Sequence, residues 1–212
     1  MVLHLMLSAF ILQAPAAPAP SSRTASLIAL YDSARDDEAR ETLVRYIADR
    51  GDAAAINKLV AIAKSDVGSD VRERAIRRLA DQTDPEALTR LTKLYADIND
   101  NDLKETILRS IGDRGEPKGD EFLRGVALSE QEDSDLRDRA IRKLADRSGD
   151  AATTFLIDLY DRVKDTDVKE TIIRRLADRG DAKAIQKLES IAKSDPDGDL
   201  RDIALRRLVE RP

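Results

Sequence analysis

Arginine and lysine recur at fixed places in this 212-residue sequence, and clusters of such groups can bind phosphates or carboxylates. The densest stretch, DLRDRAIRKLADRSGD (Asp135 to Asp150), holds four arginines and one lysine among acids and small apolar residues. The same stretch could equally be the salt-bridged, solvated face of a helix. The organisation of the whole chain has to decide between a binding contact and a structural role.

The sequence lacks most of the residues that other kinds of reactive site require. The sequence has no cysteine, which excludes disulfides, thiolate metal sites and cysteine nucleophiles, and its one histidine is His4 in an apolar N-terminal segment. No glycine-rich phosphate loop is present, and acids recur throughout instead of forming one pair suited to acid–base catalysis. We therefore expect a protein that is not an enzyme and that uses no metal or other cofactor.

Two acidic segments contain the oxygen ligands that Ca²⁺ prefers, DINDND (Asp97 to Asp102) and DPDGD (Asp195 to Asp199). Neither has the full spacing of a known calcium loop. Aspartate is also a common turn and N-cap residue. We interpret both segments as turns and caps, with calcium binding as the alternative.

The composition favours exposed helices. Charged residues make up 36% of the chain with signs nearly balanced at net −5, and only 3% of residues are aromatic. Balanced charge with regular apolar spacing indicates salt-bridged helices, whereas a polyanion-binding domain is usually clearly basic.

An internal repeat explains the recurring arginines. The string Arg-x-Leu-Ala-Asp and its variants occur six times, at steps of 32 or 33 residues. The anchor arginines are Arg45, Arg77, Arg109, Arg142, Arg174 and Arg206.

Each copy predicts two amphipathic helices, A and B. Helix B shows apolar residues at helical spacing, as in Val71, Ala75 and Leu79. We expect B to begin at an N-cap aspartate: Asp70, Asp102, Asp135, Asp167 and Asp199. Glycine ends it in several copies: Gly51, Gly115, Gly149 and Gly180. Helix A carries one leucine in every copy: Leu27, Leu59, Leu91, Leu123, Leu156 and Leu188.

Two-helix units of this kind, with a paired Arg and Asp in the second helix, resemble HEAT repeats. Their length is similar to the short bacterial class named after phycobilisome lyases. The resemblance covers about 190 residues and implies an all-α solenoid of six two-helix repeats that stack into one core. It also implies a ladder between neighbouring repeats, built from the anchor arginines and the acids that follow them by four residues: Asp49, Asp81, Asp113, Asp146, Asp178 and Glu210.

A second period, twice as long as the 32-residue repeat, is also present. Four residues after the helix A leucine the chain alternates between large and small residues, namely Tyr31, Ala63, Tyr95, Ala127, Tyr160 and Ala192. Alternating layers allow adjacent repeats to interdigitate. The physical unit is therefore a pair of repeats, 64 or 65 residues long and present three times.

The N-terminal 22 residues predict a signal peptide followed by an Ala/Pro linker, and residues 23–212 predict the solenoid. Val2 to Leu12 form a short apolar run and Ala14-Pro15-Ala16 offers a small-x-small cleavage pattern, although no basic residue precedes the run. A clipped membrane anchor is the alternative. The expected location is periplasmic or secreted, in a bacterium.

Our main functional hypothesis is a non-enzymatic scaffold whose curved B-helix surface binds a protein or peptide. The basic residues expected to line this surface are Arg74, Arg77, Arg78, Arg139, Arg142, Lys143, Arg174, Arg175 and Arg207. Within the stretch Asp135 to Asp150, Arg139 and Lys143 lie outside the anchor column and are the candidates for contacting a partner.

Three alternatives remain. The same stripe could bind an anionic ligand or nucleic acid, although Tyr46 is the only aromatic in these columns and stacking aromatics usually accompany such sites. The chain could be the regulatory tail of a membrane-associated system. Lastly, Ile203 replaces the polar residue of most other copies and no polar capping helix follows, which suggests end-to-end self-association.

Overall fold

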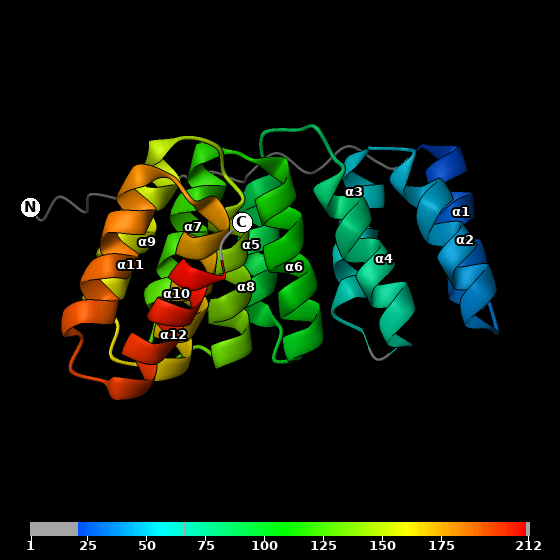
Figure 1. The fold of residues 1–212 in the computed structure, drawn as a ribbon. Helices are drawn as coiled ribbons and strands as arrows, with labels where there is room; N and C mark the ends of the chain where they lie inside the picture. Colours follow the sequence, from blue (N-terminus) through cyan, green and yellow to red (C-terminus); the bar gives the residue numbers. More distant parts are fainter. Residues whose placement is uncertain (1–20, 66, 211–212) are drawn as a thin grey trace, which may run out of the picture.

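The computed structural model describes residues 21–65 and 67–210, which form twelve α-helices and no strand (Figure 1). The A helices are α1 (Ser22–Ser33), α3 (Ala53–Ala63), α5 (Ala87–Asp97), α7 (Pro117–Leu128), α9 (Asp150–Arg162) and α11 (Ala182–Ser194). The B helices are α2 (Asp37–Ala48), α4 (Ser69–Ala80), α6 (Asn101–Arg114), α8 (Ser134–Ala145), α10 (Thr166–Arg179) and α12 (Gly198–Val209). The prediction of an all-α solenoid of six two-helix repeats is confirmed.

The N-terminal prediction falls almost wholly outside the part of the chain that the structure describes. Residues 1–20 are not described, and Ser21 caps α1 by accepting a hydrogen bond from the Thr24 N–H. Within the described ranges, no helix is long and apolar enough to span a bilayer.

The helices form two layers that run from α1 and α2 at one end to α11 and α12 at the other (Figure 1). Neighbouring B helices pack directly against one another along the whole stack, whereas neighbouring A helices contact each other far less. The B layer is therefore the tighter, inner side of the curve, and the A layer is the splayed, outer side.

Apolar columns between the layers form one continuous core. The helix A leucines from Leu59 to Leu188 are buried, and Leu27 of the first repeat is half-buried. Tyr31, Tyr95 and Tyr160 are buried in alternate repeats, with Ala63 or Ala127 buried in the repeats between them. Large and small layers thus interlock, as the sequence predicts.

The predicted B-helix N-caps are wrong by two residues. Asp100, Asp133, Asp165 and Asp197 are the caps of α6, α8, α10 and α12, and each accepts a bond from the N–H two residues later. The donors of these bonds belong to the aspartates that we expected to cap: Asp102, Asp135, Asp167 and Asp199 donate their backbone N–H. These later acids lie in the first turn, where negative charge still suits the helix dipole.

Glycine ends two B helices as predicted. Gly115 and Gly180 are the C-caps of α6 and α10, with φ of 67° and 63°. A residue with a Cβ atom is strained in this left-handed region, which explains why glycine stands at the end of these two helices.

A buried hydroxyl joins the first two repeats and makes stability depend on pH. The fully buried Thr24 donates its hydroxyl to Asp52, whose other carboxylate oxygen accepts from the Ala55 N–H at 2.9 Å and caps α3. These bonds, the Thr24 bond foremost, lower the pKa of Asp52 below its ordinary value of 3.8. Because the pKa is lower in the folded state, the stabilisation is present above the unfolded pKa and is lost as pH falls through the folded pKa.

We expect Thr24→Val to remove part of this pH dependence. The free energy of unfolding of the wild type should fall below about pH 4 more steeply than that of the variant. Urea unfolding between pH 2 and 7 measures both curves. Equal slopes on the acid side would show that the Thr24–Asp52 bond contributes nothing to the linkage.

Candidate binding surface

The six anchor arginines lie at the same place on each B helix, and we call this row the arginine ridge. The prediction that these arginines form a ladder with acids of neighbouring repeats is wrong. Instead, the ridge arginines of α4, α6, α8 and α10 pair with an acid one turn earlier in their own helix: Arg77 with Glu73, Arg109 with Glu105, Arg142 with Asp138 and Arg174 with Glu170.

The direction of helical side chains explains this pairing. Long side chains in an α-helix point back towards its N-terminus, so an arginine reaches residue i−4 and not residue i+4. An acid that precedes a base by four residues is also the favoured orientation of such a pair.

The ridge guanidiniums remain open to solvent. The side chains of Arg77, Arg109, Arg142 and Arg174 are 42–56% exposed. Glu73 accepts a hydrogen bond from Nη2 of Arg77. A guanidinium has five N–H donors, so most of them remain available. The ridge is therefore structurally paired but keeps hydrogen-bonding capacity.

The ladder between B helices is built by other cations. Arg74 of α4 pairs with Glu41 of α2, Arg139 of α8 pairs with Glu105 of α6, and Lys143 pairs with Asp113 at 2.6 Å. Arg139 and Lys143 are thus not free cations, because both bridge neighbouring repeats. Burial and the nearby Arg142 also lower the pKa of Arg139.

The remaining predicted site residues make weaker local pairs. Arg78, Arg175 and Arg207 each contact an acid three residues later in their own helix, at 3.3, 3.1 and 3.9 Å. All nine predicted residues lie on B helices. The anchor arginines pair within their own helices, whereas Arg74, Arg139 and Lys143, which lie outside the anchor column, bridge neighbouring repeats.

A second row of arginines, which the sequence analysis missed, stitches the B layer together. Arg114, Arg147 and Arg179 come one residue after the acid of each repeat motif. Each donates to backbone carbonyls at the end of the preceding B helix: Arg114 to Ala80 and Gln82, Arg147 to Gly112, and Arg179 to Ala145 and Arg147. We call this row the carbonyl ladder.

The carbonyl ladder satisfies groups that a helix leaves unpaired at its C-terminus. Positive charge there also compensates for the acid in the last turn. The signal was visible in the sequence as a basic column, Arg50, Arg114, Arg147 and Arg179, interrupted only by Gln82.

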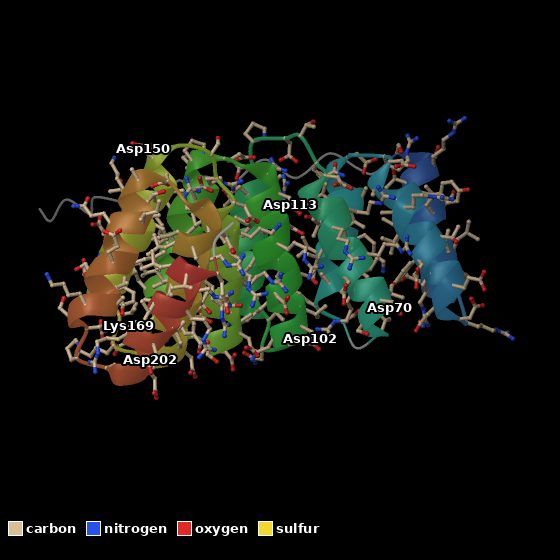
Figure 2. All side chains as sticks on the ribbon, viewed as in Figure 1. Asp70, Asp102, Asp113, Asp150, Lys169 and Asp202 are labelled. Atoms are coloured by element: carbon tan, nitrogen blue, oxygen red, sulfur yellow. The ribbon has the colours of Figure 1, made fainter. Side chains whose placement is uncertain are left out.

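Crevices open at the surface between some of the packed B helices. One of these crevices measures about 550 Å³ and lies between α4 and α6. Its lining is Arg74, Arg77, Arg78, Ala80, Asp81, Ser110, Asp113 and Arg114. Figure 2 labels Asp70 and Asp102 at one edge of the B layer and Asp113 towards the other, and the crevice lies at the Asp113 edge.

Two small residues of α6 break the repeat next to this crevice. Ser110 stands where α4, α8, α10 and α12 have a lysine or arginine, and Gly112 stands where α4 and α8 have alanine. A Cβ atom on Gly112 would lie 2.7–2.9 Å from the side chain of Lys143, so glycine lets α8 pack closely there. Ser110 and Gly112 are therefore the signal in the sequence that distinguishes this copy from its neighbours.

The acidic loops behave as caps and bridges. Asp100 and Asp197 cap α6 and α12, Asp97 accepts a bond from Lys64 at 2.9 Å, and Asp195 accepts one from the Tyr160 hydroxyl at 2.8 Å. Among the described residues, no group of three or more histidines, cysteines or acids could hold a metal ion.

The outer face of α12 exposes apolar side chains. Leu205 is 54% exposed and Val209 is 75% exposed. The residues equivalent to Leu205 in the five preceding B helices are all fully buried: Val44, Ile76, Leu108, Ile141 and Ile173.

Comparison with known proteins places the chain in a family. The model of HEAT repeats matches residues 24–112 and 123–208, and no curated protein matches the sequence. A chain of the complex of CpcE and CpcF of phycocyanin lyase from Nostoc is 16% identical at a TM-score of 0.44, over 94% of this chain and 80% of that one. Human deoxyhypusine hydroxylase is 18% identical at a TM-score of 0.36, over 91% and 86%. Because the family model covers most of the sequence, this chain belongs to the HEAT-repeat family.

Proposed function

We propose that the chain is a binding scaffold whose B-helix surface engages a protein partner, without catalysis and outside the cytoplasm. The observation that carries the proposal is the arginine ridge. Four consecutive B helices present a guanidinium that is 42–56% exposed and that an acid of the same helix holds in place. Arginines fixed in this way lose little conformational freedom on binding, and arginine is enriched where interfaces concentrate their energy.

Alternating charge favours a protein partner over a polyanion. Each of these four ridge arginines stands beside an acid in its own helix, and exposed aspartates lie at both edges of the B layer, such as Asp70 and Asp113. A nucleic acid would meet these carboxylates along its whole length, whereas a protein surface can place both signs of charge opposite them. The net charge of −5 acts in the same direction.

A charge-reversal experiment tests the proposal. We expect Arg77→Glu, Arg142→Glu and Arg174→Glu, combined, to abolish capture of a partner from the cells that produce the protein. The matched control reverses three exposed cations of the A layer, Lys93, Lys118 and Lys193. Equal capture by the ridge variant, or loss of capture in the control alone, would contradict the proposal.

A second candidate function is end-to-end self-association, favoured by the exposed face of α12. Burial of the five residues equivalent to Leu205 shows that this position is covered wherever another repeat follows. A second copy could cover it in the same way. Sedimentation velocity should show association that Leu205→Glu removes, and a wild type that stays monomeric at high concentration would contradict it.

A further inference from the structure

We propose that the crevice between α4 and α6 is the subsite of the B-helix surface that receives an acidic side chain, aspartate or glutamate, from the protein partner. This inference rests on the proposed function and makes it more specific. The crevice differs from the other junctions in its shape, and it is lined by arginines with N–H groups that make no bond.

The shape follows from Ser110. At the equivalent position, Arg78, Lys143, Arg175 and Arg207 carry long side chains. Ser110 is only 8% exposed and lines the crevice, so its short side chain leaves open the space that a longer one would fill. This space, about 550 Å³, is ample for a carboxylate side chain and part of its backbone.

The donors converge on the same space. Glu41 accepts from Nη2 of Arg74 and Asp81 from Nη1 of Arg78, so both arginines keep other N–H groups. The Nε of Arg74 is buried without a hydrogen-bond partner, as are those of Arg137, Arg139 and Arg175, and the Ser110 hydroxyl makes no hydrogen bond in the described part of the chain. An unpaired buried donor costs free energy until an acceptor reaches it.

Guanidinium groups outnumber carboxylates in the lining. Four arginines and two aspartates line the crevice, and Arg74, Arg77 and Arg114 each also pair with one glutamate outside the lining. Asp81 and Asp113 are both 64% exposed at the rim, where they pair with Arg78 and Lys143. A carboxylate can accept two parallel N–H bonds from one guanidinium, and the ridge residue Arg77 lines the same space.

The test fills the crevice with the residue that other repeats use. In Ser110→Arg, the new side chain has Asp113 three residues later as its partner, as Arg78 has Asp81. We therefore expect a melting temperature within about 2 °C of the wild type, since exposed ion pairs contribute little. The control is Ser190→Arg, which makes the same change at an exposed serine on α11. Arg78→Gln is a second variant that removes a donor and leaves the space open.

The probe is a fluorescent peptide of alternating glutamate and glycine, with glutamine replacing glutamate in its neutral counterpart. Binding to the acidic peptide should weaken at least about tenfold in Ser110→Arg and in Arg78→Gln, and should stay unchanged or strengthen in Ser190→Arg. The direction of the change in binding is informative, because an added positive charge that acted only at long range would strengthen binding to the acidic peptide.

Three outcomes would overturn the assignment: equal or tighter binding by Ser110→Arg, equal binding of the neutral peptide, or tighter binding of inorganic phosphate than of the acidic peptide. If one of these occurs while the ridge variant still loses its partner, the crevice fails and the scaffold function stands. If the ridge variant keeps its partner, the scaffold function itself fails.

Discussion

Replacing Tyr95 with alanine is expected to lower the free energy of unfolding by about 3–5 kcal/mol. The ring is 4% exposed and lies edge-on to Phe122 of the next A helix, with ring centroids 5.3 Å apart. Its hydroxyl donates to Glu132 at 2.9 Å, and Lys104 Nζ lies 4.8 Å from the ring centroid. Burial, with Glu132 second, raises the pKa of Tyr95, so the hydroxyl stays protonated at neutral pH. The substitution therefore leaves a cavity between the third and fourth repeats.

Chemical denaturation followed by circular dichroism measures this loss. Tyr95→Phe keeps the ring and should cost only about 1 kcal/mol, the value of one hydrogen bond. Tyr46 is 47% exposed on α2, so Tyr46→Ala is a control with a small expected effect. Equal losses for the alanine variants at Tyr95 and Tyr46 would be incompatible with interlocking large and small layers.

Removing the guanidinium of Arg179 is expected to cost about 3 kcal/mol. Its three nitrogens donate to the carbonyls of Ala145, Arg147 and Gly149, each at 2.8 Å, and to the Thr153 hydroxyl at 2.6 Å. Arg179→Ala leaves carbonyls at the end of α8 without their partner. Arg179→Lys has one donor group in place of a fork and should recover only part of the loss.

Arg174 is the matched control, because it lies on the same helix and is 43% exposed with one pairing acid. We expect Arg174→Ala to change the free energy of unfolding by less than about 1 kcal/mol. A larger loss at Arg174 than at Arg179 would restore the anchor column as the structural ladder and contradict the carbonyl ladder.

The architecture could be predicted because it depends on repetition. Apolar residues at helical spacing, leucines such as Leu91 in every copy, and Tyr/Ala alternation all follow from one period, and each copy supports the others. A single stretch such as Asp135 to Asp150 does not carry this information alone.

Pairings between columns could not be predicted in the same way. Arg142 has an acid four residues before it and another four residues after it, and side-chain direction decides that Asp138 is its partner. The contacts of Arg139 and Lys143 depend on how closely α8 approaches α6, which is a property of packing and not of spacing along one helix.

Predicting the crevice from the sequence would have required recognising a departure from the repeat. A serine or a glycine on a helix indicates nothing by itself. Ser110 and Gly112 are informative only when they are compared with the equivalent residues of the other copies. Comparing columns for a single small residue would have indicated α6, but the volume and the unpaired Nε of Arg74 required the three-dimensional arrangement.

The most direct test of the binding surface is site-specific photocrosslinking. The sequence has no cysteine, so one introduced cysteine carries a benzophenone label at a chosen position. We predict that a label at Arg142 on the ridge forms a discrete adduct with the partner, and that labels at Lys93 and Lys118 on the A layer do not. Adducts from the A-layer positions with none from Arg142 would contradict the assignment of the B-helix surface.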